Sequence, residues 1–313
     1  MKDNLTAENQ PAEPVVPADS ELPAEQPARR HRPSFPSWYD YIVLALLFLI
    51  SQALLGFVAM KCGLQPEAVQ QIAEPAPDAH APADATMNDV ARASALGYIA
   101  GMASLVVMVL VYRRLRGGGG RVARFSPRGF DPAWLLEGFV VVLAASVVVE
   151  PLVELLPGTP DYNLLGRGSW ALLSTVVCAP LFEEFLFRGV ILEAVRRRRG
   201  VPAAWLISSL CFGLAHGLPS QMVATGIIGL VLGHMYIRSG SLFGSIVLHA
   251  LNNALAMLLL ILGYGDATLS SLVGHKTYYV IYAVAAVIFL WWAVGACRTA
   301  MAVQRRERGQ AGL

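Results

Sequence analysis

Cysteine is scarce in this sequence, and the few cysteine residues lack the spacing that would form a disulfide framework or bind a metal. The 313 residues include only four cysteines. A disulfide framework or a zinc knuckle needs cysteines paired at short spacings, and no such pair is present. The four lie in or beside apolar segments, where a free cysteine behaves as a small apolar residue: Cys62, Cys178, Cys211 and Cys297.

Signals of nucleotide binding are absent as well. The sequence contains no Gly-rich phosphate loop, no dinucleotide fingerprint and no internal repeat. Its one glycine run, residues 117–120, is not followed by the Lys and the Ser or Thr that a phosphate loop requires. That run therefore indicates a flexible linker.

Charge is also scarce, since charged residues make up 15% of the chain while 55% of it is hydrophobic. This composition excludes an ordinary soluble globular domain and indicates a membrane protein. The Arg residues come in clusters, and each cluster adjoins an apolar segment. We therefore interpret them as determinants of topology and contacts for anionic lipids, with no nucleic-acid partner.

Apolar runs long enough to cross a bilayer recur along the chain. A membrane helix needs about 20 mostly apolar residues. The sequence predicts an all-α fold, a polytopic membrane bundle of about eight transmembrane helices, in which the fourth span is long and the fifth short. The predicted spans are residues 41–60, 95–112, 134–156, 170–195, 203–216, 221–237, 242–262 and 278–297.

The chain divides into four regions. Residues 1–37 are rich in Pro, Ala and Glu, which predicts a disordered cytoplasmic tail. About 40 residues precede the first apolar run, so we expect that run to be a retained span rather than a signal peptide. Residues 38–164 hold three spans with an outer loop at 61–94, residues 165–262 hold the polar motifs, and residues 263–313 hold the last span and a basic tail.

The positive residues predict the orientation. With the N-terminus inside, 20 of the 24 Lys and Arg residues lie on the cytoplasmic side or at helix ends that face it. Cytoplasmic loops retain positive charge, so both termini are expected in the cytoplasm and the protein in a cell membrane. Four positive residues remain outside: Lys61, Arg92, Arg167 and Lys276.

Two adjacent carboxylates lie inside the apolar fourth span. Ionisable groups at membrane depth are costly, so each is a functional candidate by default. Glu184 and Arg188 stand four residues apart with the Glu first, the favourable order for a helical ion pair. Glu183 points about 100° away around the helix and lacks that partner, as suits a general base. Taken alone, this motif fits a structural Glu–Arg pair equally well.

Two histidine motifs follow. Phe212 and His216 share one helical face near the end of the fifth span, and His249 and Asn253 share one face of the seventh. Each motif alone is weak, because a single histidine is more often a satisfied interfacial or core residue. Along their helices, at 1.5 Å per residue, Glu183 lies about 24 Å, His216 about 22 Å and His249 about 14 Å from the cytoplasmic ends. All three can therefore meet in the bilayer interior.

Together these motifs resemble the CPBP family of intramembrane peptidases, also called the ABI family, which includes CAAX prenyl endopeptidases and bacteriocin-processing proteins. The family pattern is Glu-Glu-x-x-x-Arg, then Phe-x-x-x-His, then His-x-x-x-Asn. It occurs here in order over about residues 165–260, which marks residues 165–262 as a peptidase-like core. The matching residues are Glu183, Glu184 and Arg188, then Phe212 and His216, then His249 and Asn253.

The resemblance implies an intramembrane endopeptidase that hydrolyses a peptide bond of a membrane-associated protein or peptide. It implies that Glu183 and His216 activate water. By the same resemblance, His249 and Asn253 stabilise the oxyanion. The remaining motif residues would support the geometry of the site: Glu184, Arg188 and Phe212.

Two alternatives stay open. Two histidines and one carboxylate form a known catalytic zinc set, so Glu183, His216 and His249 would be the zinc ligands of a metallopeptidase. We favour the version without a cofactor, because Asn253 suits an oxyanion donor better than a zinc ligand. The second alternative is a non-catalytic membrane scaffold or a bacteriocin-immunity-type protein. A scaffold, however, does not need unpaired polar groups at membrane depth.

Overall fold

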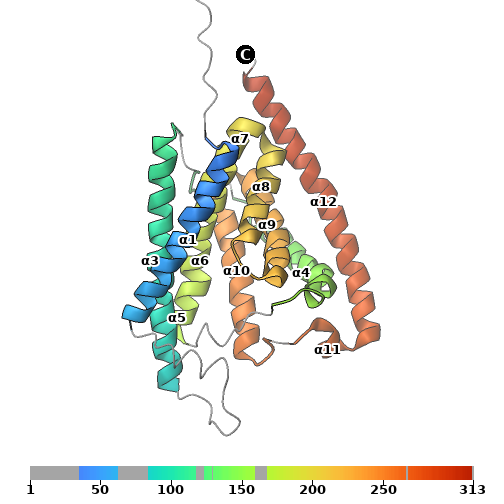
Figure 1. Cartoon of the computed structure of the whole chain (residues 1–313). Helices are drawn as coiled ribbons and strands as arrows, with labels where there is room; N and C mark the ends of the chain where they lie inside the picture. The colour runs from blue at the N-terminus through green and yellow to red at the C-terminus, as the bar shows by residue number, and fades with distance from the viewer. Residues whose placement is uncertain are drawn as a thin grey trace, which may run out of the picture. The chain divides into compact units, whose positions relative to one another are not determined.

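The structure, a computed structural model, describes residues 35–62, 84–117, 123–128, 130–158, 168–265 and 267–311, and these form helices and no strand (Figure 1). The predicted all-α membrane bundle is confirmed. Segments η2 and η3 are π-helical, and the other elements are α-helices. In chain order they are α1 (Trp38–Lys61), α3 (Asp84–Leu115), α4 (Pro132–Glu154), α5 (Ser169–Leu172), η2 (Leu173–Cys178), α6 (Ala179–Glu184), η3 (Phe185–Leu192), α7 (Glu193–Arg199), α8 (Val201–Leu214), α9 (Pro219–Ser239), α10 (Leu242–Ile261), α11 (Leu269–Val273) and α12 (His275–Ala311).

Among the described residues, seven helices are long and apolar enough to cross a membrane, when Ser169–Arg199 is counted as one continuous helix. The fifth predicted span is the exception. Helix α8 has 14 residues, so it is about 21 Å long, whereas the apolar core of a bilayer is about 30 Å thick. Helix α8 is therefore too short to cross that core by itself. In the turn that follows it, His216 is half-buried and lines a cavity, whereas Gly217 and Leu218 are exposed.

One predicted boundary differs from the structure, and another prediction lies mostly outside the described residues. The predicted tail, residues 1–37, lies outside the described residues except for its last three, of which Phe35 is buried and packs edge-on against Tyr112. The predicted outer loop, residues 61–94, is shorter than expected because α3 begins at Asp84. The start of α3 was not predicted because its first turns are polar, and the search for apolar runs finds only the stretch that follows them.

The long fourth span carries two π-helical segments, η2 and η3, on either side of α6. At the end of η2 the Ala179 N–H donates to the carbonyl of Ser174, five residues earlier. The same register would pair the carbonyl of Thr175 with Pro180, which has no N–H. The carbonyl of Thr175 is therefore available to a side chain from another helix. Such bulges often occur at functional sites.

Helices α1 and α3 pack closely through two glycines. A Cβ added to Gly97 would lie 2.7 Å from the carbonyl oxygen of Leu55, and one added to Gly101 would lie 2.8 Å from the Leu55 Cβ. Glycines four residues apart on one face let the backbones of two membrane helices approach each other. This contact holds α1 beside α3 and fixes the position of Tyr98, the neighbour of Gly97.

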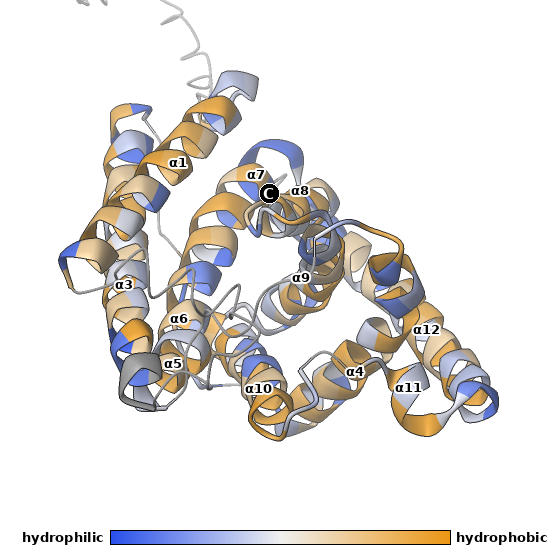
Figure 2. Cartoon of the chain, turned by 60° about the horizontal axis from the view of Figure 1, so that its bottom comes forward, coloured by the Kyte–Doolittle hydropathy of each residue, from blue (hydrophilic) through white to orange (hydrophobic). Residues whose placement is uncertain are grey.

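The Arg-rich helix ends gather at one end of the bundle. The Nε of Arg196 donates to Oε1 of Glu307 at 2.8 Å, which joins the end of α7 to the end of α12. Arg198 Nη1 donates to the carbonyl of Pro36, just before α1, at 2.7 Å. The C-terminus and α7 lie at one end in Figure 1 and α11 at the other, and Figure 2 shows the hydrophilic turn at α7 above mostly apolar helices. The charge distribution predicts that the Arg-rich end is cytoplasmic.

Candidate active site

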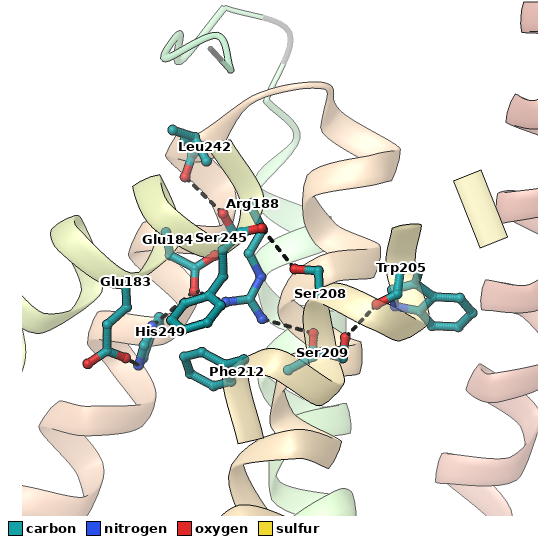
Figure 3. Close-up of polar contacts among 12 residues, drawn as sticks. Glu183, Glu184, Arg188, Trp205, Ser208, Ser209, Phe212, Leu242, Ser245 and His249 are labelled. Carbon is teal, nitrogen blue, oxygen red and sulfur yellow. Dashed lines mark hydrogen bonds and ion pairs between the residues drawn. The ribbon is translucent and has the colours of Figure 1, made fainter. Parts of the chain in front are cut away.

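The two adjacent glutamates of α6 have different surroundings. The side chain of Glu184 is 0% exposed, whereas that of Glu183 is 15% exposed. Figure 3 shows the Glu183 carboxylate near the ring of His249, on the far side of that ring from Arg188. The structure therefore separates the pair as their offset around the helix predicts.

Glu184 anchors a buried polar network. Arg188 Nη1 donates to Glu184 Oε1 at 2.7 Å, so the ion pair predicted from the spacing is present. The same carboxylate oxygen lies 3.1 Å from His249 Nδ1, and Arg188 Nη2 donates to the carbonyl of Gly229 at 3.0 Å. A buried charge needs such partners because desolvation is costly. The network connects α6, η3, α9 and α10.

Phe212 lies between the polar residues and is 1% exposed. The guanidinium carbon of Arg188 is 4.5 Å from its ring centroid, a cation–π distance. The rings of His216 and His249 meet it edge to face, with centroids 5.0 Å and 5.6 Å away. Phe212 therefore packs against both imidazoles. Figure 3 shows it beside Arg188 and His249.

The hydrogen bonds of the two histidines determine which ring nitrogen carries a proton. His216, just after the end of α8, has its Nδ1 2.9 Å from the carbonyl of Phe212. A carbonyl only accepts, so Nδ1 carries the hydrogen and Nε2 of the neutral ring presents a lone pair. His249 likewise donates from Nδ1 to Glu184, and its Nε2 faces Glu183 Oε2 at 3.9 Å.

Asn253 has a contact that the sequence did not reveal. Its Nδ2 donates to the carbonyl of Thr175 at 2.9 Å, the carbonyl left free by Pro180. Asn252 Nδ2 in turn donates to Asn253 Oδ1 at 3.2 Å. The π-helical register of η2 thus orients the Asn253 amide, which keeps one N–H for another acceptor.

Tyr98 is a site residue that the motifs missed. Its hydroxyl donates to Glu183 Oε1 at 2.8 Å from helix α3, 85 positions earlier in the chain. Tyr98 lies outside the region of family resemblance. The only signal in the sequence is a phenol in an otherwise apolar stretch, which is common in membrane helices and does not indicate a partner.

One cavity of about 700 Å³ brings the predicted catalytic side chains together. Glu183, His216, His249 and Asn253 all line it, and Phe212 forms part of its wall. Glu184 and Arg188 do not line it, because both are fully buried behind the wall. The volume falls within the range of about 300–1,000 Å³ that is typical of ligand sites.

The ligands of the zinc alternative are Glu183, His216 and His249. In the part of the chain that the structure describes, no three His, Cys, Asp or Glu side chains lie close enough to hold a metal ion. His249 Nδ1 is already directed at Glu184, which leaves only Nε2 for another partner. Glu183, His216 and His249 all line the same cavity.

Comparison with known proteins agrees with the motifs. Residues 166–255 match the family model of Type II CAAX prenyl endopeptidase Rce1-like proteins. The chain is 22% identical over 174 residues to the putative membrane peptidase YdiL of Bacillus subtilis (strain 168), covering 50% of this chain and 68% of that protein. It is 31% identical over 171 residues to an uncharacterized 24.3 kDa protein of Escherichia coli, covering 49% of this chain and 75% of the other.

A third relative is the membrane-embedded CAAX protease MroQ of Staphylococcus aureus (strain USA300). It is 26% identical over 147 residues, which cover 42% of this chain and 60% of that protein. No solved structure matches the chain. The region matched by the family model contains all seven motif residues and excludes Tyr98.

Proposed function

This chain belongs to the Rce1-like family of type II CAAX prenyl endopeptidases, multi-pass membrane proteases, and on that premise we propose that it hydrolyses a peptide bond inside the cavity at Glu183. Its substrate is a membrane-associated protein or peptide, and its location is a cell membrane with both termini in the cytoplasm. The observation that carries the proposal is the convergence of Glu183, His216, His249 and Asn253 on one cavity.

In this mechanism a water molecule attacks the substrate carbonyl carbon while Glu183 removes a proton from the water. Tyr98 donates to Oε1 of Glu183, so Oε2 is the oxygen that accepts this proton. The lone pair on Nε2 of His216 orients the same water. Collapse of the tetrahedral intermediate breaks the C–N bond, and the proton held by Glu183 passes to the leaving amine.

The negative charge that develops on the carbonyl oxygen needs fixed donors, whose loss typically costs about 10² to 10³ in rate. Asn253 has one N–H left for this task, since the other is bound to Thr175. His249 donates from Nε2 only when its ring carries both protons, because Nδ1 donates to Glu184. The carboxylates of Glu183 and Glu184 lie on either side of that ring and supply its countercharge.

A scaffold would use the same helices only for packing, so the function is tested in cells. We expect a comparison of wild type with Glu183→Ala, at matched protein levels, to show at least one membrane peptide or protein that accumulates uncleaved in the variant. Mass spectrometry of the membrane fraction measures this accumulation. Identical peptide profiles in the two strains would favour the scaffold over the peptidase.

The metal-free assignment is tested by chelation. The purified protein is expected to keep its peptidase turnover after exhaustive chelation, because Glu183 rather than a metal activates the water. Turnover and elemental analysis are measured on the same preparation. Stoichiometric zinc, with activity lost on its removal and regained on its addition, would replace the glutamate mechanism with a metallopeptidase mechanism.

A further inference from the structure

Most residues that line the cavity lie in the half of the bundle opposite the Arg-rich end, and Glu183 and His249 lie near its middle. From α1 and α3 the lining residues include Ala59, close to the end of α1, and Tyr98, near the middle of α3. Thr225 stands in the second turn of α9, and Leu260 in the last turn of α10. Beyond α10 the lining continues to Tyr264, which is 46% exposed. The cavity therefore reaches the molecular surface at the end that carries α11.

The path toward the Arg-rich end is filled with side chains. Arg188 and Leu192 follow Glu183 along the fourth span toward α7, and both are fully buried. Leu248 precedes His249 in α10 and so lies closer to the Arg-rich end, and it is fully buried. Leu232 of α9 is fully buried as well. The three leucines belong to one hydrophobic core cluster, and with Arg188 they occupy the space between Glu183 and the Arg-rich end. A substrate cannot pass through close-packed side chains of this kind.

The lining also restricts the charge of what enters. Among the described lining residues, Glu183 is the only carboxylate, and no Lys, Arg or Asp contributes. A charged substrate side chain would lose its hydration here without gaining a countercharge beyond Glu183. Neutral polar groups, among them Ser174, Thr225 and Asn252, offer hydrogen bonds to a peptide backbone instead.

We infer that the substrate reaches Glu183 from the non-cytoplasmic face of the membrane, as an uncharged peptide segment that enters beside Tyr264. The inference rests on the proposed function and on the cytoplasmic location of the Arg-rich end. It restricts the substrates to proteins or peptides whose cleaved segment is translocated or lies in the outer half of the bilayer. Segments held at the cytoplasmic surface are excluded, because the packed core separates them from the cavity.

Thiol labelling tests the route without requiring turnover. Single cysteines are placed in the cavity as Ser174→Cys or Thr225→Cys, in the full chain from which the four native cysteines have been removed. Two exposed positions serve as matched controls: Lys276→Cys at the start of α12 and Arg305→Cys near its Arg-rich end. A membrane-impermeant methanethiosulfonate with a positive charge, for which Glu183 is the countercharge in the cavity, is added to right-side-out and to inside-out membrane vesicles.

In right-side-out vesicles, both cavity cysteines are expected to react as Lys276→Cys does, while Arg305→Cys reacts only in inside-out vesicles. Cavity cysteines that react only in inside-out vesicles, or in neither preparation although they react in detergent, would overturn the inference. Reaction of Arg305→Cys from outside would overturn it too, by reversing the topology. A cavity labelled from outside in a protein that cleaves no substrate would contradict the proposed function alone.

Discussion

Glu183→Gln is expected to give a folded protein whose peptidase turnover falls by about 10² to 10⁴, the usual effect of losing a general base. The amide keeps the size of the carboxylate, and its oxygen still accepts the hydrogen bond from Tyr98. The side chain is partly exposed to the cavity and takes no part in the Glu184–Arg188 pair. Melting in detergent should therefore barely change. Turnover of the purified variant and its melting temperature are measured together.

Glu154→Gln is the matched control for this change. Glu154 is the last residue of α4, is exposed, and does not line the cavity. Its neutralisation should leave both turnover and melting as in wild type. Wild-type turnover in Glu183→Gln would show that the catalytic assignment is wrong, and the scaffold would then be the better account of the polar network between α6 and α10.

The motif spacing predicted the local contacts of the site because α-helices place residues four apart on one face. Glu184 and Arg188 pair as expected, and the rings of Phe212 and His216 touch. The contact between the Phe212 and His216 rings is present although His216 lies in the turn after α8 rather than inside the helix. The turn keeps the side chain beside Phe212 through the hydrogen bond from Nδ1.

Contacts between distant helices were not predictable from the same pattern. Tyr98 meets Glu183 because Gly97 and Gly101 let α1 and α3 pack closely, and no spacing within one helix carries that information. Asn253 meets the carbonyl of Thr175 because the helix changes register before a proline. The sequence shows that proline but does not specify how the register changes.

The depth of the site was predicted only in part. Counting residues from the cytoplasmic ends placed Glu183 and His216 at similar depths, and both line the cavity. The same count treated α8 as a full span, although its 14 residues are too few for one. Length alone could not show whether the following turn is exposed or enclosed, since enclosure depends on the helices around it.

Glu184→Gln is expected to damage the protein in a different way, by lowering stability and activity together. The change leaves the guanidinium of Arg188 without its countercharge at a position where both side chains are 0% exposed. Breaking a buried pair by removing one partner typically costs about 3–5 kcal/mol. It also weakens the acceptor that orients His249. Melting temperature, expression level and turnover should all fall.

A second ion pair provides the matched control, because Glu137 and Arg238 are paired at 37% and 32% side-chain exposure. Solvent screens such a pair, so Glu137→Gln should cost no more than about 1 kcal/mol and leave turnover intact. If the uncompensated charge causes the damage in Glu184→Gln, adding Arg188→Met should raise the melting temperature part of the way back to the wild-type value. Turnover should stay low, because the residue that accepts the hydrogen bond from His249 is still changed. A Glu184→Gln protein that melts like wild type would show that the buried pair does not stabilise the fold. A double variant that is less stable than Glu184→Gln would show that Arg188 acts through its bond to Gly229 rather than through its charge.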